Sequence, residues 1–141
     1  MSLKRPAARP LVVAARNAPG KVPAATLRSK VLTKATVRVA DRLGLGQAEL
    51  AGIIGVSPST ASRMFTGGWV IQEETKNWEL AALLVRVFRS LDALVGGNEK
   101  QVKQWFQAMN THLGGAPRQL IASVEGLTNV ARYLDAMRGA Q

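Results

Sequence analysis

The sequence predicts an all-α fold of roughly seven helices. Apolar residues recur at helical spacing through most of the chain, and no segment keeps the strict alternation of apolar and polar residues that is typical of a strand. Prolines and paired glycines separate these segments, where helices are expected to begin or end. Hydrophobic residues make up 47% of the 141 residues, which is enough for one domain, or for two small ones that share a core.

The first 23 residues differ in composition from the rest of the chain. They contain four prolines and five basic residues but no acidic residue. Because proline at this density opposes a helix, residues 1–23 are predicted to form a flexible basic arm. Two roles fit such an arm: contact with the phosphates of a polyanion, or solubility alone.

A helix is predicted from about Ala24 to Leu43. Apolar residues recur every four positions along it and are expected to face the core: Leu27, Val31, Ala35, Val39 and Leu43. Its other faces carry basic residues: Arg28, Lys30, Lys34, Arg38 and Arg42. Residues 1–50 hold ten Lys and Arg against two acids, whereas residues 51–141 hold nine against seven. This asymmetry predicts a polyanion partner for the front of the chain and a different partner for the back.

The next segment, QAELAGIIGVSPSTASRMFTG from Gln47 to Gly67, has the pattern of a helix-turn-helix. Gly55 stands where the chain must leave the first helix, a position that favours a positive φ. Ser57 can cap the second helix through its hydroxyl, and Pro58 fits the first helical position. Residues 24–68 are therefore predicted to form a helix-turn-helix module, although an ordinary helical hairpin in a core is the alternative.

The second helix of this motif, from about Pro58 to Thr66, is expected to lie in the major groove of DNA. Ala61, Met64 and Phe65 are expected to face inward, leaving small, polar and basic side chains outside. Arg63 is the best candidate for a guanine contact, because its fork matches O6 and N7 of that base. Gln47 is expected to bond a phosphate. The predicted DNA-binding residues are Gln47, Ser57, Ser59, Thr60, Ser62 and Arg63.

Residues 69–97 are predicted to form a connector and then the most apolar helix of the chain, from Asn77 to Val95. So wide an apolar surface on a small protein is either a central core helix or a dimer interface. We expect mainly core, with part of the face left for a partner. Because one short recognition helix rarely gives adequate operator affinity, we also expect a homodimer with this helix as its seam.

Residues 98–141 are predicted to contain shorter helices, over about 99–110, 117–126 and 128–138. Gly114-Gly115 would end the first, Pro117 would open the second and Thr128 would cap the third. In the first of these helices Val102, Trp105, Phe106 and Met109 are expected to face inward. The second carries apolar residues at Leu120, Ile121 and Val124, and the third has Val130, Leu134 and Met137 on one side.

Residues 99–126, EKQVKQWFQAMNTHLGGAPRQLIASVEG, resemble the C-terminal module of the Xre/MbcA/ParS antitoxins. The matching features are Trp105-Phe106, Asn110, Leu113-Gly114-Gly115, Pro117, Leu120 and Gly126. Members usually have leucine where Phe106 stands and an acid after the proline, where this chain has Arg118-Gln119. With the helix-turn-helix upstream, the resemblance covers about residues 36–141.

This resemblance implies an antitoxin of a type II toxin–antitoxin pair. The front module would bind operator DNA in its own promoter as a repressor. The back module, residues 98–141, would cover the active site of a RES-domain toxin that consumes NAD⁺. Residues on exposed faces near the chain end are the toxin-binding candidates, unless they only solubilise the last helix: Arg118, Arg132, Tyr133, Asp135 and Arg138.

The sequence contains few of the residue types that catalysis needs. Cysteine is absent, and His112 is the only histidine, so no thiolate nucleophile exists and no serine has a histidine nearby in sequence to activate it. We therefore expect no enzyme activity, no metal and no cofactor. No apolar run approaches the roughly 20 residues of a membrane span, and a cytoplasmic location is expected.

Two other functions remain as alternatives to the antitoxin. One is a helix-turn-helix repressor that responds to a small ligand or to another protein partner. The other is a basic RNA-binding protein, which would need exposed aromatic residues for base stacking. A neighbouring gene for a RES-domain protein would favour the antitoxin.

Overall fold

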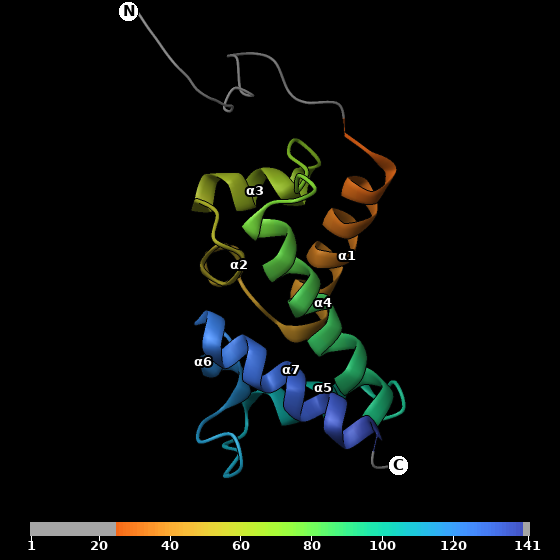
Figure 1. The fold of residues 1–141 in the computed structure, drawn as a ribbon, viewed down its shortest axis with the longest axis vertical. Coiled ribbons are helices and arrows are strands. Elements are labelled where there is room, and N and C mark those ends of the chain that lie inside the picture. The colour runs from red at the N-terminus through yellow and green to blue at the C-terminus, as the bar shows by residue number, and fades with distance from the viewer. Residues whose placement is uncertain (1–24, 140–141) are drawn as a thin grey trace, which may run out of the picture.

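The computed structural model describes residues 25–139 as a bundle of seven helices without a strand (Figure 1). The predicted all-α fold is thus confirmed for this range, whereas the predicted arm, residues 1–23, lies outside it. The helices are α1 (Leu27–Leu43), α2 (Gln47–Ile54), α3 (Pro58–Thr66), α4 (Lys76–Leu94), α5 (Glu99–Gln107), α6 (Pro117–Leu120) and α7 (Val124–Gly139).

Local signals set most of the helix boundaries. The Ser57 hydroxyl accepts a hydrogen bond from the Thr60 amide at 3.1 Å, and Pro58 follows it at the first helical position. Gly55 ends α2 with a φ of 78°, a conformation that side chains with a Cβ rarely adopt. Asn98 caps α5 through its side chain, as Thr75 caps α4. The predicted helix-turn-helix is therefore present as α2, the turn at Gly55 and α3.

Helix α4 runs through the middle of the molecule and contacts both ends of the chain. In Figure 1 it passes from the α1–α3 group to the α5–α7 group. Leu84, Val87 and Leu91 are at most 1% exposed and belong to one continuous core. The predicted dimer seam along this helix is therefore wrong for most of its width, because α1, α2 and α7 already cover that stripe.

The apolar spacing of α1 predicts its buried face correctly in the second half of the helix, where Val39 and Leu43 are 4% and 0% exposed, but not in the first half. Leu27 and Val31 are 76% and 58% exposed, whereas Ser29, Thr33 and Thr36 are buried. The two threonine hydroxyls donate to carbonyls one turn earlier at 2.7 Å, which satisfies them inside the core. The Thr33 oxygen also accepts the Ile71 amide at 2.8 Å. The buried Thr33 side chain therefore supplies the acceptor that the buried amide of Ile71 needs.

The last helices differ from prediction in their boundaries. Helix α7 begins at Val124, so that Thr128 lies inside it and donates to the Val124 carbonyl instead of capping. A Cβ on Gly126 would lie 1.8 Å from the Leu120 carbonyl oxygen, so only glycine permits this early start. Met109, which was predicted to face inward, is 72% exposed, and the apolar residues Val124 and Met137 are 61% and 43% exposed.

The Thr33 bond gives a test of how α1 is held in the bundle. Thr33→Val keeps the side-chain shape but leaves the buried Ile71 amide without its acceptor, which should lower the free energy of unfolding by about 1–3 kcal/mol. Thr36→Val is the matched control, because Thr36 is equally buried but bonds only within its own helix, and it should cost less than about 1 kcal/mol. Urea unfolding measures both, and equal losses would contradict the role assigned to Thr33.

Candidate functional site

Helix α3 presents the predicted DNA-contacting residues on one side of the molecule. Ser57, Ser59 and Arg63 are exposed, whereas Thr60 and Ser62, also predicted to face out, are half-buried. Gln47 is the first residue of α2 and is exposed. The helix is anchored from below by Ala61 and Met64, which are 0% and 3% exposed.

Hydroxyl groups order the outer face of α3. The Ser57 oxygen lies 3.1 Å from that of Ser59, and the Ser57 hydroxyl donates to Thr60 Oγ1 at 3.0 Å. Arg63 Nη2 in turn donates to Thr60 Oγ1 at 3.3 Å. The Arg63 guanidinium is thus held along the helix surface while remaining exposed. A positioned fork beside short polar side chains is suited to a base edge in the major groove.

A basic groove adjoins α3 where it meets α1. Lys30, Lys34 and Arg38 line its α1 side, and Phe65 and Trp69 lie at the end of α3, enclosing about 690 Å³. The three basic residues are exposed and project from successive turns of α1. Cations at this spacing fit a phosphate backbone beside the recognition helix. The sequence indicated the basic face, but not its position next to Trp69.

Arg118 links the back of the chain to the helix-turn-helix. Its Nε and Nη2 donate to the two carboxylate oxygens of Glu49 at 2.9 and 2.7 Å, and Nη2 also donates to the Gly44 carbonyl at 2.9 Å. Glu49 accepts the Gly46 amide as well, at 3.0 Å. The prediction that Arg118 lies on an exposed face is therefore wrong, since its side chain is 29% exposed and engaged within the chain.

This ion pair is sensitive to acid. The hydrogen bond from Arg118, and then that from the Gly46 amide, lowers the pKa of Glu49 below its ordinary value. A lowered pKa in the folded state means that the contact stabilises the fold above the ordinary pKa of glutamate. The contribution is lost as the pH falls through the lowered value. The link between the two parts of the chain is thus present at neutral pH.

Polar contacts also fix α7 on α4. Asp135 accepts hydrogen bonds from Arg86 and from the Ser90 hydroxyl, and Arg138 Nη1 donates to Ser90 Oγ at 3.1 Å. The bond from Arg86 is the main cause of the lowered pKa of Asp135. Asp135 was predicted to be exposed, but it is partly buried between these helices. Arg132 and Arg138 are exposed as predicted.

Aromatic rings join α5 to α7. Tyr133 stacks on Trp105 with ring centroids 6.3 Å apart, and His112 lies 6.1 Å from the same tyrosine. Tyr133 and Trp105 are therefore half-buried, where the first was expected to be exposed and the second to be core. Nearby, Asn110 holds the turn before α6, because its Oδ1 accepts the Leu113 amide at 3.0 Å.

Residues 25–139 contain neither a cluster of metal-ligating side chains nor a helix suited to span a membrane. Within this range no group of three or more His, Cys, Asp and Glu residues is placed to hold a metal ion. Nor does any helix there combine the length and apolar character needed to cross a membrane.

Comparison with family models assigns both parts of the molecule. Residues 22–68 match the antitoxin Xre-like helix-turn-helix domain, which covers α1 to α3. Residues 90–140 match the antitoxin Xre/MbcA/ParS C-terminal toxin-binding domain, which covers α5 to α7. A search of curated proteins found no match. The first match contains the exposed helix α3, and the second contains α7. The chain belongs to the Xre/MbcA/ParS family of antitoxins.

Proposed function

We propose that this antitoxin neutralises a RES-domain toxin that consumes NAD⁺ by covering its active site, and that it represses its own promoter. The observation that carries the proposal is the separation of two faces on one core. Figure 1 shows α3 and the C-terminal end of α7 at opposite ends of the molecule. A chain built in this way holds DNA and a protein partner at the same time.

On the DNA side, α3 enters the major groove with Arg63 toward the bases. The Ser57 and Ser59 side chains are short, so the helix backbone approaches the groove closely. Gln47, the first residue of α2, bonds a phosphate in this proposal, and the α1 cations follow the DNA backbone beyond it. Base contacts then supply the sequence preference, and phosphate contacts supply affinity for any DNA.

Replacing Arg63 with alanine should therefore weaken binding to the chain's own promoter by about 1–3 kcal/mol, with a far smaller loss on random duplex. Lys34→Ala is the matched comparison, since Lys34 is an exposed cation that lines the basic groove and lies outside α3. It should weaken both duplexes alike and reduce the slope of log K against log salt by about 0.9. Fluorescence anisotropy measures both, and equal losses for Arg63→Ala on the two duplexes would move Arg63 to a backbone role.

The antitoxin is proposed to act on DNA as a homodimer. Helix α3 has nine residues, and two such helices on two-fold-related half-sites reach an affinity that one does not. Light scattering of the toxin-free chain at micromolar concentration should give twice the 15.1 kDa mass of one chain. A monomeric mass under those conditions would contradict the dimer.

On the toxin side, we propose that the exposed arginines of α7 reach the mouth of the NAD⁺ site. Arg132 and Arg138 are exposed, while Arg118, Tyr133 and Asp135 shape the module through their internal contacts. Deleting α7 is not a clean test, because Leu127, Val130 and Leu134 of that helix are fully buried. Single substitutions on the exposed face of α7 leave these buried residues in place. They therefore test the blocking of the toxin without disturbing the fold.

Arg132→Glu should abolish rescue of growth when the variant is co-expressed with the RES-domain toxin encoded beside it, while promoter binding is retained. The reason is that an anion replaces the cation at the proposed point of entry. Lys103→Glu is the control, because it makes the same charge change on an exposed position of α5 in the same domain. If both variants protect cells equally well, the blocking surface does not include Arg132.

A further inference from the structure

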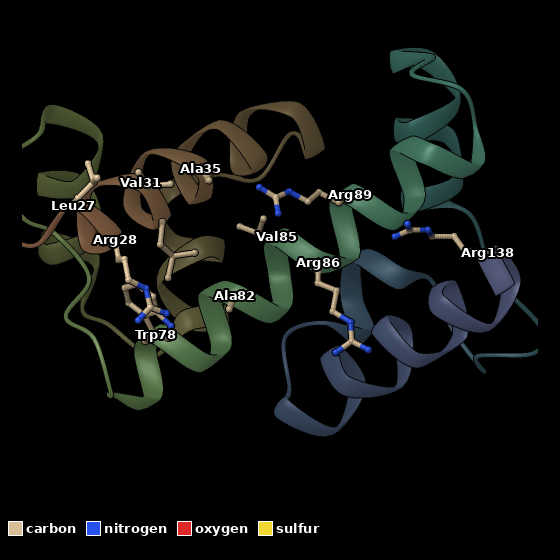
Figure 2. Close-up of a pocket in the computed structure, with 11 residues that line it drawn as sticks. Leu27, Arg28, Val31, Ala35, Trp78, Ala82, Val85, Arg86, Arg89 and Arg138 are labelled. Carbon is tan, nitrogen blue, oxygen red and sulfur yellow. The ribbon is translucent and has the colours of Figure 1, made fainter.

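An open apolar groove lies between α1 and α4 (Figure 2), and none of its lining residues belongs to the basic groove. It encloses about 660 Å³ and is lined by Leu27, Val31 and Ala35 of α1 and by Trp78, Ala82 and Val85 of α4. Leu27 and Val31 stand one turn apart, and most of each side chain is exposed. Neighbouring aliphatic side chains on a groove wall are typical of a surface that another protein covers.

The rim of this groove is cationic. Four arginines line it together with the apolar residues, and no acidic residue does: Arg28, Arg86, Arg89 and Arg138. Three of them have partners, since Arg28 bonds Glu73 and lies over the Trp78 ring, Arg86 bonds Asp135, and Arg138 bonds Ser90.

Arg89 has no such partner among residues 25–139 and projects into the space between α1 and α4 in Figure 2. The groove therefore offers an apolar floor with a positive charge at its edge. A ligand that fits it has apolar side chains on one face and carboxylates beside them.

This charge pattern distinguishes between possible occupants. The chain's own residues 1–23 carry five basic residues and no acid, so they would bring cations to an arginine rim. A second copy is also disfavoured, because the chain holds 19 basic residues against nine acidic ones and would present the same arginines. An amphipathic segment of another protein with acidic residues along its edge meets both requirements.

The position of the groove indicates which protein supplies that segment. Its rim runs from Arg28 and α1, within the matched helix-turn-helix domain, to Arg138 of α7, within the matched toxin-binding domain. We propose that an acidic amphipathic segment of the cognate toxin docks in this groove as a second contact, which rests on the proposed function of the C-terminal domain. The toxin would then touch the DNA-binding domain as well as the toxin-binding one.

The test is calorimetric titration of the full chain with the purified toxin encoded beside it. Two variants alter the groove: a double variant with Leu27→Ser and Val31→Ser, and the single variant Arg89→Glu. Each should weaken toxin binding by about 10- to 100-fold and leave promoter binding unchanged. Lys34→Glu is the control, since it reverses a charge on α1 at a residue that lines the basic groove and not this one. It should leave toxin affinity near that of the unaltered chain and weaken DNA binding instead. Toxin affinity should also lose part of its salt dependence in Arg89→Glu.

The outcomes separate this inference from the function on which it rests. If the unaltered chain binds the toxin and the groove variants bind it equally well, the groove proposal is overturned and the C-terminal contact stands. If the groove variants only break up a self-associated species, a second copy occupies the groove and the proposal is likewise overturned. If the unaltered chain does not bind that toxin, both proposals fall together.

Discussion

The wide apolar face of α4 is the contact on which the rest of the structure depends. The two groups of smaller helices pack against different parts of this helix, and their buried apolar residues form one cluster with it. Leu84, Val87 and Leu91 lie inside that shared core. The ion pair between Arg118 and Glu49 adds a second connection away from α4. The DNA-binding and toxin-binding domains are therefore joined through one packed interior, because the buried residues of both belong to the same core.

The parts that sequence predicts well are those in which neighbours along the chain fix the conformation. Ser57, Pro58 and Gly55 act within one turn of their own positions, and the helix-turn-helix was predicted from them with its ends within a residue. The turn that follows α5 is also local, because Asn110 bonds the Leu113 amide. Cap hydrogen bonds and a positive φ depend on the identity of one or two residues, which the sequence states directly.

The parts that sequence could not predict depend on partners far along the chain. Arg118 follows Glu49 by 69 positions, and Ile71 follows Thr33 by 38, so no spacing pattern reports either contact. The apolar repeat of α1 predicts the burial of Val39 and Leu43 correctly, but in the first half of the helix Thr33 is buried, where it accepts the Ile71 amide, and Val31 is exposed. Gly126 was taken for a helix end because glycine usually breaks helices, whereas here it permits close packing on the Leu120 carbonyl. For Arg118 and Thr33 a long-range contact outweighed the local preference, whereas Gly126 meets a carbonyl only six positions earlier.

We propose different ligands for the cations that line the two grooves beside α1, because the neighbouring elements differ. Lys30, Lys34 and Arg38 stand beside the hydroxyl-rich recognition helix, where a uniform row of phosphates is the fitting anion. Arg89 stands among aliphatic side chains, and a phosphate there would leave Leu27 and Val31 uncovered. Carboxylates on an amphipathic protein segment satisfy both the charge and the apolar area.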